Sequence, residues 1–209
     1  DDCNGKGRVT SQQDIVLYLL TSLTFADCPN PEPFKEVFWG DLHVHTVHSL
    51  DASLQGTKQT HQQAYAFAKG ELETNGQRLP IPLDFVAITD HAEFLGELDI
   101  CSNPNLKGYD SMTCRLYRSH PQTAFILLNS ALSKSPKGNP PVVKRWRMCR
   151  RDNVECEERA LNVWDELKQV AEENNDPCIF TTFPAYEWSA SPKTNNLHRN
   201  ILFLNATTP

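Results

Sequence analysis

The sequence of 209 residues lacks a run of apolar residues that could span a membrane, and it lacks an excess of positive charge. Its longest apolar stretch near the start, Ile15 to Phe25, is interrupted by Thr and Ser and is shorter than the roughly 20 residues that cross a bilayer. The formal net charge of −6 argues against a general nucleic-acid binder, because such proteins neutralise phosphates with basic side chains. We therefore expect neither a membrane span nor a nucleic-acid partner.

Internal repeats, low-complexity tracts and a charged-then-apolar leader are also absent, and residue 1 is Asp rather than Met. These features indicate a processed or trimmed product. A hydrophobic fraction of 39% and a charged fraction of 22% are ordinary for a soluble protein. At this length we expect one domain with a sizeable core.

The seven cysteines form no CxxC pair, which argues against a structural zinc site built from them. Cys101 and Cys114 bracket a loop rich in Pro, Asn, Gly and Ser. Cys149 and Cys156 bracket a charged loop. Loops closed by nearby cysteines are typical of oxidising compartments, so the sequence predicts two local disulfides in a periplasmic or secreted protein. The alternative is that several of these cysteines are buried thiols.

The remaining cysteines are Cys3, Cys28 and Cys178. Cys3–Cys28 is a weaker third pair, and it would leave Cys178 buried and free. Asn205 begins a glycosylation sequon, which matters only in a eukaryotic secretory pathway.

Residues 36–44 are expected to form a short buried strand that ends in metal-binding side chains. His43 and His45 point to the same side of an extended segment, because side chains alternate along a strand. Two imidazoles on one face suit a divalent ion, which binds nitrogen at about 2.0–2.1 Å. Asp51 follows a polar turn that can bring it back to the same place. The alternative is a strand with two half-buried histidines that bond to backbone alone.

A second buried strand is expected over Pro82–His91, after a helix at about Thr60–Thr74. A strand, a helix and a strand within about fifty residues form a βαβ unit, in which the two strands are parallel. Sites in α/β folds lie at the carboxyl ends of such strands. Asp90 and His91 are therefore expected beside the two histidines of the first strand.

The rest of the sequence divides into an N-terminal extension and the main domain. Residues 1–35 are expected to form a helix (Asp14–Phe25) and a proline-rich linker. Residues 36–209 are expected to form the domain itself. Residues 92–157 are expected to be a loop-rich insertion that acts as a lid or a substrate wall. Its basic cluster, Lys144–Arg151, is either a solvated face or a landing site for an anionic substrate.

A clear amphipathic helix is predicted over Glu157–Asn174. A third buried strand follows over Cys178–Trp188 and carries Glu187 near its carboxyl end. A fourth strand, Leu197–Leu204, carries His198 near its start. The metal ligands predicted from all these segments are His43, His45, Asp51, His91, Glu187 and His198.

Mixed imidazole and carboxylate ligands suit Zn, Mn or Fe. These ligands exceed the needs of one tetrahedral ion, so we expect more than one divalent ion, with Glu187 able to bridge two of them. Ions about 3.5–4 Å apart activate water at neutral pH and stabilise the entering and leaving oxygens of a phosphoryl transfer. The predicted chemistry is therefore metal-dependent hydrolysis of a small anionic substrate.

Several short motifs occur in order along the chain: Asp41-Leu-His-Val-His-Thr46, Ser49-Leu-Asp51, Ile88-Thr-Asp-His91, Tyr186-Glu187 and Leu197-His198. This ordered set resembles the first motifs of the PHP (polymerase and histidinol phosphatase) superfamily. Longer phrases such as Phe183-Pro-Ala-Tyr-Glu-Trp188 are similar to a poorly characterised branch of exported bacterial proteins. The resemblance runs from about residue 36 to the end. It implies an α/β fold, a distorted (β/α)7 TIM-like barrel that holds up to three metals.

By matching position, the resemblance also implies a role for most of the ligands. His43 and His45 would bind the first ion. Glu187 would bridge it to a second ion, which His198 would bind.

Asp51 and His91 would bind the third ion. Asp41 and Asp90 would orient the imidazoles, with ordinary strand-end hydrogen bonds as the alternative. Arg199 would contact a substrate phosphate or form a salt bridge. The histidines that match no motif, and are expected on the surface, are His48, His61 and His120.

The chain departs from the superfamily after His198. The superfamily completes its site with later ligands, whereas residues 199–209 contain no Asp, Glu or His. Three or four strands also cannot close a seven-stranded barrel. We therefore expect the amino-terminal portion of an incomplete barrel, whose remainder comes from a missing C-terminal part or from a partner chain.

A metal-dependent phosphoesterase is the function that these observations favour. One alternative is a non-catalytic binding or assembly protein that retains a partial site. Another is a metal-dependent hydrolase of a different bond, such as an amide or a sulfate ester, because metal ligands alone do not select the electrophile.

Overall fold

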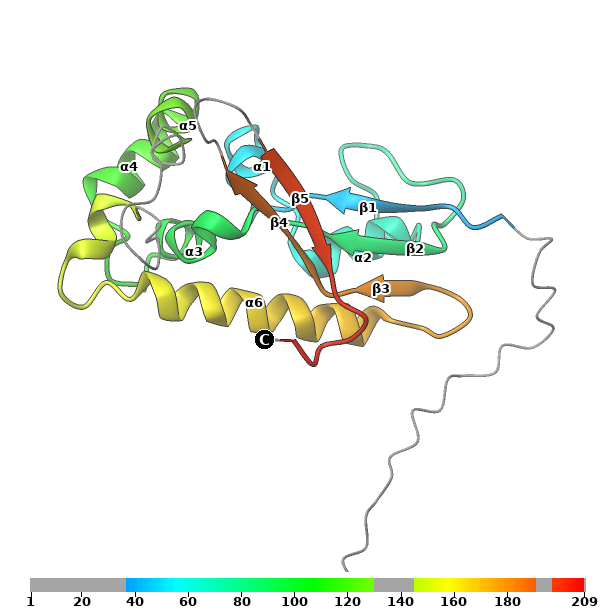
Figure 1. Cartoon of the computed structure of the whole chain (residues 1–209). Coiled ribbons are helices and arrows are strands. Elements are labelled where there is room, and N and C mark those ends of the chain that lie inside the picture. The colour runs from blue at the N-terminus through cyan, green and yellow to red at the C-terminus, as the bar shows by residue number, and fades with distance from the viewer. Residues whose placement is uncertain (1–36, 130–144, 191–196, 209) are drawn as a thin grey trace, which may run out of the picture.

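The computed structural model describes residues 37–129, 145–190 and 197–208 (Figure 1). Within these ranges the chain forms a three-stranded parallel sheet, a two-stranded antiparallel hairpin and helices that pack around them. No helix in these ranges is long and apolar enough to cross a membrane. The predicted N-terminal helix, the proline-rich linker and the Cys3–Cys28 pair lie outside the described residues.

The parallel sheet contains β1 (Gly40–Val44), β2 (Phe85–Ile88) and β3 (Thr181–Phe183), in that order. Both pairings are parallel and a helix lies between β1 and β2, which confirms the predicted βαβ unit. Gly40 pairs with Phe85, and a Cβ at this position would overlap the ring and the carbonyl oxygen of Phe85. Because the strands are parallel, their carboxyl ends meet at one edge of the sheet.

Two helices, α2 (His61–Ala68) and α6 (Cys156–Asn174), pack against the sheet and against each other. A capping box begins α2: the Thr60 hydroxyl accepts the N–H of Gln63, and the Gln63 side chain accepts the N–H of Thr60. The helix α6 begins one residue before the predicted helix and ends at the predicted residue. The core that these elements share contains Tyr65, Ala68, Val86, Ile88, Leu167, Ala171 and Phe180.

The predicted strand Cys178–Trp188 is wrong as a single element. It divides at Pro184 into β3 and β4 (Ala185–Ala190), because proline has no N–H with which to continue the ladder. The prediction of a fourth strand is confirmed by β5 (Leu197–Leu202), which pairs antiparallel with β4. The chain thus leaves the parallel sheet at the proline and starts a separate hairpin.

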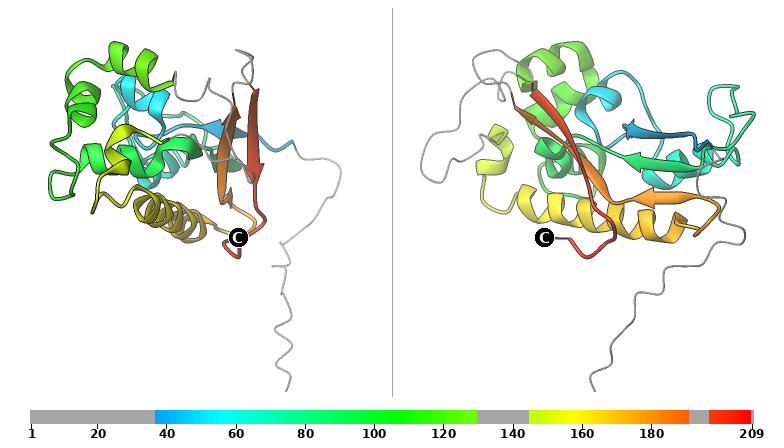
Figure 2. Two further views of the ribbon diagram at one scale, coloured as in Figure 1. Left: turned by 60° about the vertical axis from the view of Figure 1, so that its left-hand side comes forward. Right: turned by 45° about the vertical axis from the view of Figure 1, so that its right-hand side comes forward.

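The hairpin lies across the carboxyl ends of the parallel strands (Figure 2). The side-chain Nδ2 of Asn200 donates to the carbonyl oxygen of Leu42 at 2.8 Å, which joins β5 to β1. Neither sheet closes into a barrel within the described ranges, so the barrel expected from the resemblance is not observed there. The mixed α/β class is confirmed.

The first strand is not buried as the sequence predicts. Phe38, Trp39 and Leu42 are exposed, with Trp39 at 69% accessibility. The difference arises because β1 is an edge strand of the three-stranded sheet, whereas β2 is central. Accordingly Val86 and Ile88 in β2 are fully buried, as expected for a strand with neighbours on both sides.

Residues 92–157 are more helical than the predicted loop-rich insertion. Their helices gather at one end of the parallel sheet, beyond the carboxyl ends of its strands (Figure 1). The buried residues Leu98, Ile100 and Met148 belong to a second hydrophobic core in this region. The elements are η1 (Ala92–Phe94), α3 (Leu95–Ser102), α4 (Met112–Ser119), α5 (Pro121–Asn129) and η2 (Arg147–Arg150).

Two disulfides, Cys101–Cys114 and Cys149–Cys156, confirm the predicted local pairs. They fit an oxidising, extracytoplasmic compartment. The prediction that Cys178 is buried and free is wrong, because this residue is exposed and disulfide-bonded. It lies in the turn between α6 and β3 rather than inside a strand.

The described part of the basic cluster contributes to the second core and to an internal ion pair. Trp146 and Met148 are buried in the second core. Arg145 forms a bidentate ion pair with the buried carboxylate of Glu97, with Nη2–Oε2 at 2.7 Å and Nε–Oε1 at 3.0 Å. This guanidinium therefore neutralises an internal carboxylate and is not available to an anionic substrate.

Candidate metal centre

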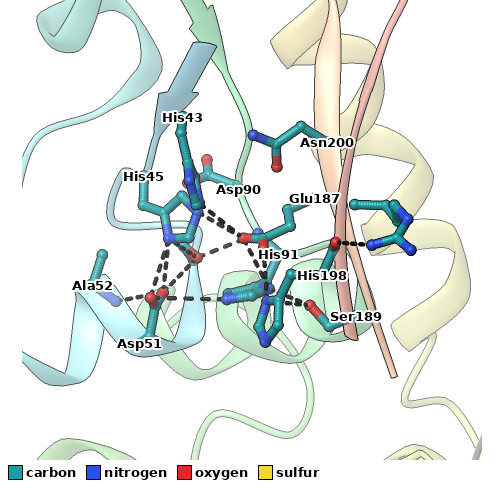
Figure 3. A network of polar contacts seen from close by, with 12 residues as sticks. His43, His45, Asp51, Ala52, Asp90, His91, Glu187, Ser189, His198 and Asn200 are labelled. Carbon is teal, nitrogen blue, oxygen red and sulfur yellow. Dashed lines mark hydrogen bonds and ion pairs between the residues drawn. The ribbon is translucent and has the colours of Figure 1, made fainter. Parts of the chain in front are cut away.

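The side chains that the sequence predicts as metal ligands lie together where the parallel sheet meets the hairpin (Figure 3). The end of β1 supplies two of them, the residues after β2 supply one, and the two strands of the hairpin supply one each. The last comes from the short helix α1 (Leu50–Leu54). In chain order they are His43, His45, Asp51, His91, Glu187 and His198.

Glu187 is at the centre of this group, and its side chain is only 1% exposed. Its Oε2 lies 2.9 Å from Nε2 of His45 and 3.3 Å from Nε2 of His43. The same oxygen lies 3.5 Å from Nδ1 of His91. Its Oε1 lies 2.6 Å from Nδ1 of His198. One buried carboxylate thus faces four imidazoles.

Asp51 provides a second carboxylate on the other side of two of these imidazoles. Both of its carboxylate oxygens lie 3.1 Å from Nδ1 of His45, and Oδ2 lies 3.8 Å from Nε2 of His91. The hydroxyl of Ser49 and the backbone N–H of Ala52 each donate to Oδ1 of Asp51 at 2.7 Å. The carboxylate is therefore held in place from its own turn and helix.

The ligands form three overlapping groups, and each group can hold a metal ion. In each group, three ligand atoms lie within 4.8 Å of one another. Neighbouring groups share an imidazole or the central glutamate, so the three groups form one continuous cluster. The groups are His43/His45/Glu187, His45/Asp51/His91 and His91/Glu187/His198.

Burial and neighbouring charges set the protonation of the central residues. Burial alone would lower the pKa of His45, but the hydrogen bond and the charge of Asp51 raise it overall. Burial lowers the pKa of His91, although Asp51 and Glu187 oppose this shift. Burial would raise the pKa of Glu187, but the charges of His91 and His198 lower it. An ionised carboxylate and a neutral imidazole are the forms that bind metals.

Asp41 and Arg199 make local contacts. Oδ1 of Asp41 accepts the backbone N–H of His43 at 2.9 Å, so this carboxylate orders the strand end and is not bonded to an imidazole in the described residues. Arg199 is exposed in β5, and its Nη1 donates to the carbonyl oxygen of His198 at 3.0 Å.

Asp90 orients an imidazole, but not that of a predicted ligand. Its Oδ2 lies 2.9 Å from Nε2 of His61, and its Oδ1 accepts the N–H of Thr46 at 2.5 Å. The expectation that His61 lies on the surface is wrong, because its side chain is 0% exposed at the start of α2, where it meets this buried carboxylate. His48 is half-buried beside it, and His120 is exposed as predicted.

Two further residues support the site and were not predicted from the sequence. The hydroxyl of Ser189 lies 2.8 Å from Nδ1 of His91 and 3.2 Å from Nδ1 of His198. Glu93 accepts the backbone N–H of Ser189 at 2.5 Å, and burial raises the pKa of Glu93 to about 7. Strand alternation is the signal that would have found Ser189, because it lies two residues after Glu187 on the same face.

The fold and the site define a mixed α/β domain with a centre of histidines and carboxylates that can hold metal ions. The family described as protein of unknown function (DUF3604) matches residues 32–209, and the chain belongs to that family. No match was found among curated proteins or among solved structures.

Proposed function

We propose that this domain carries the metal site of a hydrolase that cleaves phosphate esters. The observation that supports it most is the enclosure of the buried Glu187 carboxylate by four imidazoles, with Asp51 beyond two of them. A carboxylate that faces nitrogen ligands on both of its oxygens is suited to bridge two ions. The ligand set suits two or three ions of Zn, Mn or Fe.

The environment of His45 favours metal binding over a network of hydrogen bonds. Its Nε2 is buried and makes no hydrogen bond, although Oε2 of Glu187 lies only 2.9 Å away. Two atoms this close, without hydrogen-bond geometry, fit two ligands of one ion, since bonds of about 2.0–2.1 Å leave neighbouring ligands roughly 3–4 Å apart. A buried imidazole nitrogen with no such role is normally hydrogen-bonded.

The chain's own residues determine how a substrate reaches the centre. Bound divalent ions would lower the pKa of water and stabilise a leaving oxygen. The side chains of His43 and His198 are 59% and 45% exposed, whereas Glu187 between them is 1% exposed. A small anion can therefore approach from the side of these two histidines. We assign Arg199, exposed next to His198, to contact its phosphate.

Phosphate is chosen over other electrophiles because the order of the motifs resembles the PHP superfamily. On this proposal, the rest of a PHP-like barrel comes from a C-terminal part or from a partner chain. The two disulfides support a periplasmic or secreted location.

The test uses full-length protein that is stripped of metal and reloaded with Zn, Mn or Fe. We expect metal-dependent hydrolysis of an aryl phosphate ester, lost in Glu187→Gln and retained in Glu73→Gln, which changes an exposed glutamate away from the site. Full metal occupancy without any cleavage would indicate a metal-binding protein without this activity. Cleavage of a sulfate ester or an amide instead would assign a different electrophile.

A further inference from the structure

A second group of side chains that could hold a metal ion lies outside the Glu187 cluster. His48 lies in the loop between β1 and α1, His61 is the first residue of α2, and Glu166 lies on α6. One ligand atom from each of these residues lies within 4.8 Å of the other two. None of them belongs to the three groups described above.

His61 is held in the orientation of a metal ligand. Its side chain is 0% exposed, and its Nε2 lies 2.9 Å from Oδ2 of Asp90. Because a carboxylate accepts the proton of Nε2, the lone pair of the neutral imidazole is on Nδ1. Proteins commonly prepare a metal-binding histidine with such a carboxylate on its other nitrogen.

The Nδ1 of His61 is buried and has no hydrogen-bond partner. Leaving such an atom unsatisfied costs about 1–3 kcal/mol, so a group that binds it is expected. Oε1 of Glu166 faces it at 3.7 Å, which is too long for a hydrogen bond. Two ligands bound to one ion at about 2.0–2.1 Å are separated by roughly 3–4 Å, so the gap is the right size for an ion between them.

His48 provides the third ligand. Its ring lies over that of His61, with centroids 4.5 Å apart and planes 23° apart. Its side chain is half-buried in the loop between β1 and α1. Two imidazoles and one carboxylate form a three-ligand zinc set that leaves a fourth position for water.

A proton is the competing occupant of this position. The carboxylates of Asp90 and Glu166 face the two ring nitrogens of His61, at 2.9 Å and 3.7 Å. Two carboxylates facing one imidazole carry more negative charge than a single proton neutralises. A divalent ion would neutralise both.

We propose that His48, His61 and Glu166 form a zinc site separate from the Glu187 cluster, with Asp90 as the residue that positions His61. The ion would connect α2 and α6 to the loop between β1 and α1, which also carries His45 of the first site. By linking these three segments, the ion would fix the position of that loop. The inference does not depend on the proposed hydrolase activity, since none of its ligands takes part in that reaction.

The experiment uses Zn²⁺ alone as the probe. The full chain is stripped of metal and titrated with zinc in competition with a chromophoric chelator, and bound zinc is counted by elemental analysis. The Glu166 side chain is 53% exposed, so Glu166→Gln is expected to leave the fold intact. We expect this variant to bind one zinc fewer, or to bind that zinc at least about tenfold more weakly. Glu158→Gln, which changes an exposed residue of the same helix, is expected to match the wild type.

His48→Ala is an independent second variant. It should lose the same zinc ion, and the double variant with Glu166→Gln should lose no more than either single variant. Equal zinc number and affinity in the wild type and both single variants would overturn the proposal and assign a proton to His61. If the variants lose this zinc ion and the wild type cleaves no phosphate ester, the result would support the site and contradict the proposed function.

Discussion

The backbone N–H of Glu187 donates a hydrogen bond to the carbonyl oxygen of Asp90 at 3.0 Å, and Glu187 forms a parallel bridge with His91. This pairing joins β4 to the residues just beyond β2. The carboxylate of Glu187 and the imidazole of His91 therefore lie side by side because of the backbone. We expect the ligands to keep this arrangement when metal is removed, because backbone hydrogen bonds position them.

Replacement of Ser189 should weaken metal binding without unfolding the protein. Its hydroxyl contacts both His91 and His198, so Ser189→Ala removes the group that orients two ligands. We expect a loss of about 10- to 100-fold in zinc affinity, measured by competition with a chelator. Ser119→Ala is the matched control, since that hydroxyl is exposed and contacts only residues of its own helix and cap. Unchanged affinity in Ser189→Ala would show that the hydroxyl does not orient the ligands.

Replacement of Asp90 should destabilise the whole domain. This carboxylate is 0% exposed and accepts hydrogen bonds from Thr46 and His61. Removing one partner of a buried charge pair typically costs about 3–5 kcal/mol, so Asp90→Ala should lower the free energy of unfolding by this amount. Urea unfolding of metal-free protein measures it. Asp110→Ala, at an 82% exposed side chain, should stay within about 0.5 kcal/mol of the wild type.

The stability of the metal-free protein should fall at alkaline pH because of His61. Its pKa is raised from 6.5 to about 9 in the folded state by Asp90 and Glu166, which outweigh burial. The stabilisation is therefore complete below about pH 6.5 and is lost as the pH rises through about 9. A shift of this size corresponds to roughly 3 kcal/mol. Urea unfolding at several pH values checks it, and His61→Gln should flatten this part of the profile. An equal slope in that variant would contradict the assignment.

The two disulfides should contribute unequally to stability. The Cys101–Cys114 bridge spans 13 residues and the Cys149–Cys156 bridge spans 7. Loop-closure entropy then predicts losses of about 3 and about 2 kcal/mol when each pair is changed to serine. Urea unfolding under oxidising conditions measures both. A larger loss for the shorter bridge would show that packing, rather than chain entropy, determines the contribution.

The sequence predicted which side chains lie together better than it predicted the fold around them. Side-chain alternation and the rule for strand ends placed His43, His45 and His91 correctly at one edge of the sheet. These signals are local, because each depends on a few consecutive residues. Pro184, which breaks the third strand, is visible in the sequence. The sequence alone does not show that β4 then leaves the parallel sheet and pairs antiparallel with β5.

The burial of His61 and the exposure of β1 could not be predicted from the sequence. A polar residue at the start of a helix is usually solvated, and only the contact with Asp90, 29 positions along the chain, explains why His61 is internal. An apolar strand such as β1 is expected to be covered, and the sequence does not show that it lies at an edge. Long-range contacts determine both properties.

The break at Pro184 also makes the spacing to Glu187 critical. Because side chains alternate from one face of a strand to the other, inserting a single residue between Pro184 and Glu187 would turn the carboxylate away from all four imidazoles. Inserting two would restore its direction but displace it by about 6–7 Å along the hairpin. The number of residues between the proline and the glutamate thus constrains this centre as strictly as the chemistry of the carboxylate does.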